Sequence, residues 1–186
     1  MNEKRFILIE GDNGTGKDTL ARRLAPYGYD VVTYDADLEA FRLEAKRSPR
    51  ERFPHEFLKY NRLCGERAAR RLAAGKKCVL VRYWPSTVAA AYADGNFSRE
   101  QALKTAAEAL KSMPRPDVSL YLRCDFGERI RRIVARDPES DDSLELDRAL
   151  RYEEIMNEVR LSTPGLQWEE IRSEGDVLAE ILPRIR

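Results

Sequence analysis

The sequence predicts an α/β fold, a three-layer sandwich in which a parallel β-sheet lies between two layers of helices. Short apolar runs alternate along the chain with longer segments of helical spacing, a pattern typical of parallel sheets. The first apolar run, residues 6–9, is continuous rather than alternating, as expected of a strand covered on both faces. No internal repeat or linker divides the 186 residues, so we predict one domain over residues 1–186.

The first half of the chain supplies three strands and three helices. After the first apolar run, Leu20 and Leu24 repeat at helical spacing until Pro26 and Gly28 end the pattern. A long segment with an arginine-rich face follows, and Gly75 ends it. The expected ranges are strands at residues 6–9, 29–34 and 78–81 and helices at residues 17–25, 38–46 and 56–74.

The second half continues the alternation. Pro114 and Pro116 separate a helical segment from the next apolar run. The acidic stretch 137–142 is too polar for a core, and helical patterns flank it, which predicts a mobile surface segment. The expected ranges are helices at residues 99–111, 127–136, 147–159 and 177–185 and strands at residues 119–122 and 167–171.

Composition excludes several classes of protein. Lys and Arg number 33 and Asp and Glu 32, so the net charge of +1 gives no global attraction to nucleic acid or to an anionic membrane. No stretch approaches the roughly 20 apolar residues of a membrane helix, and the N-terminus lacks a signal-peptide pattern. Three widely spaced cysteines favour a reducing setting. We therefore expect a cytoplasmic protein.

A phosphate-binding loop stands between the first strand and the first helix. Residues 11–17 read Gly-Asp-Asn-Gly-Thr-Gly-Lys, the P-loop pattern G-x-x-x-x-G-K in its required context. Its glycines let amide groups point at phosphate oxygens, and the lysine reaches the β- and γ-phosphates of a nucleotide. The pattern predicts ATP as the cofactor. The expected cofactor-binding residues are Gly11, Asn13, Gly14, Thr15, Gly16, Lys17, Asp18 and Thr19.

The residue after the lysine departs from the usual pattern. A Ser or Thr hydroxyl normally binds Mg²⁺ there, whereas this chain has Asp18, with Thr19 one place later. We keep Mg²⁺ as a cofactor and assign Thr19 to the metal. Asp18 is either a water-mediated partner of the metal or an acid favourable in the first turn of a helix.

Two motifs typical of other nucleotide-binding proteins are absent from the sequence, which limits the classes of function that the phosphate loop can serve. The Asn-Lys-x-Asp motif that recognises guanine does not occur in the sequence, and the third strand ends in Val81-Arg82 rather than in an Asp-Glu pair. These absences disfavour a GTPase switch and a motor ATPase, which leaves small kinases as the leading class.

Three later segments follow the phosphate loop in a characteristic order. They are residues 57–62 (Phe-Leu-Lys-Tyr-Asn-Arg), residues 80–83 (Leu-Val-Arg-Tyr) with Ser86, and residues 116–122 (Pro-Asp-Val-Ser-Leu-Tyr-Leu). With these segments, the chain resembles the thymidylate kinase family of P-loop nucleoside monophosphate kinases. The resemblance implies transfer of the γ-phosphoryl group of ATP to a nucleoside or deoxynucleoside monophosphate, giving the diphosphate and ADP. It implies small-molecule nucleotide partners, and, since the family is often dimeric, a homodimer is an open expectation.

The resemblance also implies roles for individual residues. Arg82 would bind the acceptor's phosphate, Tyr83 would lie beside it, Arg62 would hold the acceptor's base or phosphate, and Asn13 would contact its sugar. A lid-like segment at about residues 136–148 would bring arginines to the transferred phosphate and exclude water. Arg136 is the first choice as the catalytic lid residue, and Arg132 is assigned to the cofactor; Arg148 and Arg151 are further candidates.

Departures from the family pattern predict an altered acceptor pocket. Asn13 stands where the family has an acid, and Val81 replaces the Asp before Arg-Tyr. Leu58 occupies the place of the residue that stacks on the base, although Phe57, Tyr60, Trp84 and Tyr92 are close enough in sequence to supply an aromatic platform.

Two alternatives stay open. Residues 34–39, Tyr-Asp-Ala-Asp-Leu-Glu, resemble the Asp-x-Asp segment of shikimate-type kinases, in which Asp35 would be a catalytic, substrate-binding base that activates a hydroxyl group. The other alternative is a nucleotide-binding module without turnover.

Overall fold

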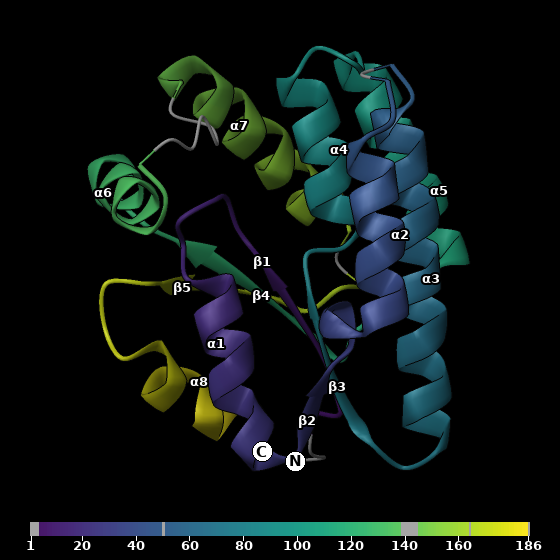
Figure 1. Cartoon of the computed structure of the whole chain (residues 1–186), viewed down its shortest axis with the longest axis vertical. Coiled ribbons are helices and arrows are strands. Elements are labelled where there is room, and N and C mark those ends of the chain that lie inside the picture. Colours follow the sequence, from purple (N-terminus) through teal and green to yellow (C-terminus); the bar gives the residue numbers. More distant parts are fainter. Residues whose placement is uncertain (1–3, 50, 139–144, 164, 186) are drawn as a thin grey trace.

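The computed structural model describes residues 4–49, 51–138, 145–163 and 165–185, and in them five parallel strands form one sheet (Figure 1). The strand order is β2-β3-β1-β4-β5, which places the first strand in the middle. The register pairs Ile9 of β1 with Val81 of β3 and with Leu120 of β4. The strands are β1 (Phe6–Glu10), β2 (Tyr29–Val31), β3 (Lys77–Val81), β4 (Val118–Arg123) and β5 (Trp168–Arg172). The predicted α/β class and the parallel sheet are confirmed.

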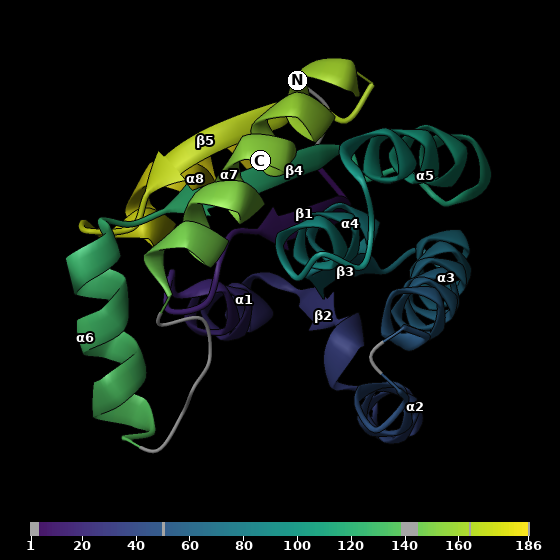
Figure 2. The same cartoon turned by 90° about the horizontal axis from the view of Figure 1, so that it is seen from above.

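Helices cover both faces of this sheet (Figure 2). One face packs against α3 (Phe53–Ala73), α4 (Trp84–Ala93), α5 (Arg99–Ser112) and α7 (Leu146–Ser162). The other face packs against α1 (Lys17–Leu24) and α8 (Val177–Ile185). Helix α2 (Ala36–Lys46) lies on the outside of α3, and α6 (Phe126–Arg136) follows the carboxyl end of β4.

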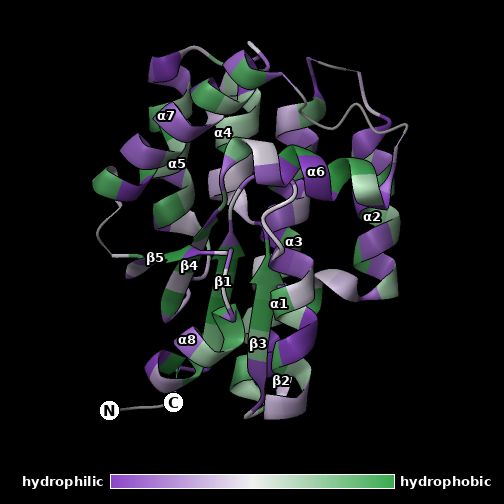
Figure 3. Cartoon of the chain, turned by 90° about the vertical axis from the view of Figure 1, so that its left-hand side faces the viewer, coloured by the Kyte–Doolittle hydropathy of each residue, from purple (hydrophilic) through white to green (hydrophobic). Residues whose placement is uncertain are grey.

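The alternation of side chains along β1 explains the two-sided core. Phe6 and Leu8 belong to the first face, whereas Ile7 and Ile9 belong to the second, and all four are at most 1% exposed. The central strands are accordingly hydrophobic, whereas most of the helices combine hydrophilic and hydrophobic residues (Figure 3). Because a parallel sheet buries both faces, its carboxyl edge is where the connecting loops gather and where ligands of such folds bind.

Three differences from the expected elements have physical reasons. The second strand ends at Val31, and a 3-10 turn, Val32–Tyr34, follows, because this edge strand pairs with β3 over three residues only. Helix α3 begins at Phe53 rather than at residue 56, with Pro54 in its first turn, a position where a missing amide hydrogen costs nothing. Helix α4 was not predicted: it is buried almost all round, so its sequence lacks the period of an amphipathic helix.

The lid-like segment predicted at residues 136–148 lies partly outside the described residues, which stop at 138 and resume at 145. Its flanks are the last turn of α6 and the first turns of α7. Among the helices that the structure describes, none combines the length and hydropathy needed to cross a bilayer.

Candidate active site at the carboxyl edge of the sheet

The phosphate loop connects β1 to α1 in the conformation that its glycines permit. Gly11, Gly14 and Gly16 have φ angles of 137°, 80° and 87°, a region that other residues rarely adopt. Lys17 is 4% exposed, and its Nζ donates a hydrogen bond to the carbonyl oxygen of Asp12 at 2.6 Å. The loop thus curls around the lysine ammonium group.

Burial and the nearby positive charge of Arg82 lower the pKa of Lys17, whereas Asp12, Asp18 and Glu10 oppose this shift. Its ammonium group therefore lies in a site where one added anion is strongly favoured, because the local carboxylates only partly offset the desolvation of the cation.

A polar pocket opens beside the lysine. Five cationic side chains line it, and Asp18 is the one carboxylate among the described residues that do so. The lining residues are Asn13, Gly14, Gly16, Lys17, Asp18, Thr19, Arg22, Arg82, Arg132 and Arg136. Predicted cofactor-binding residues from both the loop and α6 are therefore brought together. We call this cavity the phosphate pocket.

The donor set of the phosphate pocket fits a magnesium ion. Mg²⁺ is usually held by one or two carboxylates together with substrate phosphates rather than by a closed protein cage. Asp18 is exposed on the pocket and accepts a hydrogen bond from Tyr34 Oη at 2.7 Å, and the Thr19 hydroxyl is beside it. In the part of the chain that the structure describes, no group of three His, Cys, Asp or Glu forms a separate metal site.

A buried ion pair connects helix α6 to the phosphate loop. Arg129 Nη2 lies 2.5 Å from Asp12 Oδ2, and the two side chains are 3% and 4% exposed. The same guanidinium donates from Nε to the carbonyl oxygen of Asn13 at 2.9 Å. A Cβ added to Gly14 would lie 2.8 Å from the carbonyl oxygen of Arg129, so the loop touches the helix backbone directly.

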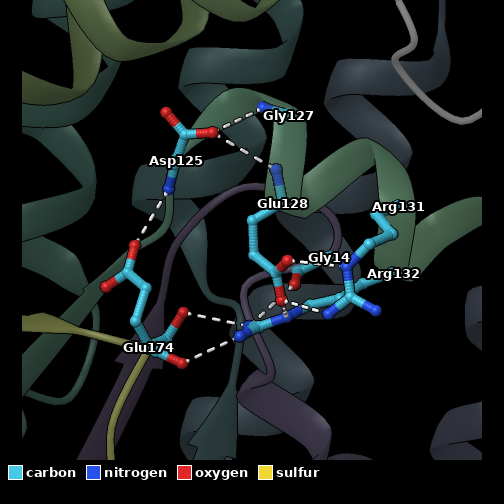
Figure 4. Close-up of polar contacts among 8 residues, drawn as sticks. Gly14, Asp125, Gly127, Glu128, Arg131, Arg132 and Glu174 are labelled. Atoms are coloured by element: carbon cyan, nitrogen blue, oxygen red, sulfur yellow. Dashed lines mark hydrogen bonds and ion pairs between the residues drawn. The ribbon is translucent and has the colours of Figure 1, made fainter.

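Arg132 makes a second set of contacts between α6 and the loop (Figure 4). Its guanidinium is held by Glu128 at 2.7 Å and extends towards Gly14, whose carbonyl oxygen lies 3.5 Å from Nη1. It also donates to the side chain and the carbonyl oxygen of Ser173, at 3.1 and 3.0 Å. The start of α6 is fixed by Asp125, which accepts hydrogen bonds from the first-turn amides.

A second, less polar pocket of about 290 Å³ adjoins the first. Its walls combine aromatic rings with cations, with the carboxylate of Asp12 and with uncharged hydrogen-bonding groups. The aromatic members are Phe53, Phe57, Tyr60 and Tyr152, the cations are Arg42, Lys46, Arg82 and Arg148, and the others include Asn13, Asn61, Ser86 and Thr87. We call this cavity the aromatic pocket.

Arg82 and Asn13 line both pockets and therefore stand at their junction. A guanidinium nitrogen of Arg82 donates a hydrogen bond to Asn13 Oδ1. Arg82 is also the one non-glycine residue with a positive φ, 64°, in the described part of the chain. Such a conformation is uncommon, and it persists where surrounding contacts impose it.

Not every predicted acceptor residue reaches these pockets. Arg62 is exposed on α3 and lines neither cavity, because the buried face of that helix passes through Asn61 instead. Tyr83 is 0% exposed and packs against Gly65 of α3, which places its ring in the core rather than in a cleft. The geometry therefore gives no support to substrate contacts of these two side chains, which stay predictions.

Asp35 is also held away from the pockets. Its carboxylate pairs with Arg67 at 2.8 Å and with Arg71 at 2.7 Å, and both arginines belong to α3. The side chain is 17% exposed and lines neither the phosphate pocket nor the aromatic pocket. This geometry gives no support to Asp35 as a base that activates a substrate hydroxyl. Asp35 instead ties the start of α2 to α3.

The site residues that sequence reasoning missed include Arg42, Phe53, Asn61 and Arg129. Asn61 is 2% exposed, and its amide donates to Thr87 Oγ1 at 2.7 Å. Asn61 has the helical spacing of the apolar residues on the buried face of α3. A polar residue at such a position was a sequence signal that could have identified it as a site residue. Arg129 had no comparable signal, because its partner Asp12 lies more than one hundred residues away.

The comparisons with known proteins agree with this architecture. The model of a family described as an AAA domain matches residues 7–157. A thymidylate kinase structure from Candida albicans superposes with a TM-score of 0.74 at 18% identity, covering 98% of this chain and 91% of that chain. A deoxyadenosine kinase structure from M. mycoides with bound dCTP gives a TM-score of 0.65 at 15% identity, covering 97% and 98%. No match was found among curated protein sequences. At these identities the likeness establishes the fold, and it confirms the resemblance to the thymidylate kinase family at that level.

Proposed function

Because the chain belongs to the AAA domain family and has two adjoining pockets, we propose that it is a P-loop kinase. It transfers the γ-phosphoryl group of ATP to a nucleoside or deoxynucleoside monophosphate. The products are the nucleoside diphosphate and ADP. The observation that carries the proposal is the position of Arg82, which lines the phosphate pocket and the aromatic pocket at once.

The phosphate pocket suits the donor. Lys17 binds the β- and γ-phosphates, the amides of residues 14–19 surround them, and Arg132 and Arg136 add charge from α6. Thr19 and Asp18 would hold Mg²⁺, which when bound neutralises part of the charge of the phosphates. A third cavity runs from Thr15 and Thr19 to Ser173 and Val177, and we assign it to the adenosine part of ATP.

The aromatic pocket suits a nucleotide acceptor. Phe53, Phe57 and Tyr60 form a cluster whose neighbouring ring centroids are 4.5 and 5.9 Å apart, a surface on which a base stacks. Arg82 supplies charge for a phosphate group at the same cavity. Arg42 and Arg148 line it as well, each in an ion pair, with Glu39 and Asp94 respectively. A phosphate acceptor needs no separate base, since it is already a nucleophile near neutral pH, and this agrees with the position of Asp35 outside the pockets.

The test is ADP release from ATP and Mg²⁺ with each common ribonucleoside and deoxynucleoside monophosphate, with nucleosides and shikimate as hydroxyl acceptors. Lys17→Ala is the blank. Turnover with one or a few monophosphates, lost in Arg82→Ala, supports the proposal. Turnover with a hydroxyl compound alone contradicts it, and binding of ATP without turnover of any acceptor favours the non-catalytic module.

A further inference from the structure

The backbone at Arg82 needs support, because its φ of 64° lies in the left-handed region that residues with a side chain rarely adopt. The residue directly follows β3, and its side chain reaches the junction of the two pockets. The direction in which the guanidinium leaves the sheet is therefore set by an unusual main-chain conformation.

The neighbouring strand β1 holds this turn at two points. Arg82 N donates to the carbonyl oxygen of Ile9 at 3.0 Å, which continues the ladder between the strands. The next amide, Tyr83 N, has no strand partner and donates instead to Glu10 Oε1 at 2.8 Å. A side chain thus replaces a main-chain acceptor at the point where the strained turn begins to lead into α4.

Glu10 is an unusual group to find there. It is 0% exposed, and its second oxygen, Oε2, is buried without a hydrogen-bond partner. The carboxyl group of Glu10 faces the Tyr83 amide and the Ser86 hydroxyl. It is also close enough to interact with the charges of Arg82 and Lys17 and with the Tyr152 side chain. A buried carboxyl group with one unsatisfied oxygen destabilises a fold. Stability therefore does not explain why a glutamate stands at this position, whereas its hydrogen bond to the Arg82–Tyr83 turn does.

We propose that Glu10 is a positioning residue for phosphoryl transfer, whose carboxyl oxygen fixes the Arg82–Tyr83 peptide and thereby aims the Arg82 guanidinium between the donor and the acceptor. The inference rests on the proposed function, because it assumes that Arg82 binds the acceptor's phosphate. Glu10 itself touches neither pocket: it fixes the near end of Arg82, while Asn13 holds the far end.

The experiment compares two replacements of Glu10 that differ in one property. Glu10→Gln keeps an acceptor oxygen for Tyr83 N, whereas Glu10→Leu removes it at similar volume. Binding of the common ribonucleoside and deoxynucleoside monophosphates is measured by calorimetry, and the tightest ligand of the wild type is followed through the variants. Binding of ATP is measured in parallel as the control for the phosphate loop.

The expected result is selective. Glu10→Leu weakens monophosphate binding by about tenfold, the effect of one lost hydrogen bond of ordinary strength, while Glu10→Gln stays within about threefold of the wild type. Affinity for ATP changes by less than about threefold in both. In the Arg82→Ala background, Glu10→Leu causes no further loss, because its effect passes through the arginine.

Other outcomes separate this inference from the proposed function. If Arg82→Ala weakens binding but Glu10→Leu does not, or if the two losses multiply in the double variant, the positioning role is wrong and the proposed function stands. If the wild type binds no monophosphate, or if Arg82→Ala leaves binding unchanged, the proposed acceptor site fails and this inference with it. Circular dichroism monitors folding, and Glu10→Ala, which also lacks the oxygen, replaces Glu10→Leu if that variant does not fold.

Discussion

The ion pair between Asp12 and Arg129 is buried, and from its burial we predict how its removal changes the free energy of unfolding. Both side chains are almost fully removed from solvent and lie 2.5 Å apart, so each is the main compensation for the buried charge of the other. Arg129→Met leaves the Asp12 carboxylate buried and unpaired, and Asp12→Leu leaves the guanidinium in the same state.

The magnitude follows from this arrangement. Each single variant should lower the free energy of unfolding by about 3–5 kcal/mol, the cost of breaking a buried pair. The double variant Asp12→Leu/Arg129→Met buries no charge. It loses the hydrogen bond from Arg129 to the carbonyl oxygen of Asn13 and the one from Asn13 N to Asp12 Oδ1, so its cost should be about 1–3 kcal/mol. The coupling energy between the two sites is then at least about 3 kcal/mol.

The assay is urea unfolding followed by circular dichroism, with thermal midpoints as a second measurement. For a chain of this length, a loss of about 4 kcal/mol lowers the midpoint by roughly 8–16 °C. Arg131→Met is the matched control: Arg131 lies on the same helix and pairs with Glu128, but its side chain is 71% exposed, so the variant should cost less than about 1 kcal/mol. Additive losses in the double variant, or equal losses for Arg129→Met and Arg131→Met, would refute the reasoning.

Three further predictions concern single residues of the site. Lys17→Ala should weaken ATP binding by about 10–100-fold, since charge-assisted hydrogen bonds to the phosphates are lost, and calorimetry that detects a smaller change would contradict its role. Asp18→Asn should raise the Mg²⁺ concentration that gives half-maximal ATP binding by about tenfold, because a carboxylate available to the ion is removed. Glu108→Gln, exposed on α5 and outside the pocket, is the control, and an unchanged magnesium dependence would argue against Asp18. Burial raises the pKa of Glu10 from 4.5 to about 7, so the stability that its neutral form contributes is present below pH 4.5 and lost as the pH rises through 7. The unfolding free energy of Glu10→Gln relative to the wild type should therefore increase by about 2.5 kcal/mol between pH 5 and pH 8, and a flat difference in denaturation curves over this range would show that Glu10 titrates normally.

Local patterns made the sheet and the phosphate loop predictable. The glycines and lysine of the loop lie within seven residues, and their backbone requirements act over that distance alone. The strands were recognisable because burial on both faces produces continuous apolar runs. Helix α4 lacked such a signature, since a helix surrounded by core has no polar face to reveal its period.

The aromatic pocket was less predictable because distant segments build it. The phase of the apolar face of α3 distinguishes Asn61 from Arg62, but which part of that face lines a cavity depends on how α3 packs against β3 and α4, which local sequence does not fix. The engagement of Asp35 by Arg67 and Arg71 depends in the same way on how α2 crosses α3. The buried Asp12–Arg129 pair joins the second loop residue to a helix that follows the fourth strand, a distance over which periodicity carries no information.

The hydrogen bond from Lys17 to the carbonyl oxygen of Asp12 uses one of the three N–H donors of the ammonium group. An anion can therefore bind to the remaining donors without displacing this bond. The bond holds the long lysine side chain in place before any ligand arrives, so little conformational entropy is lost when an anion binds. The curled loop is in this sense preorganised: the position of its cation is set by the protein main chain rather than by the ligand.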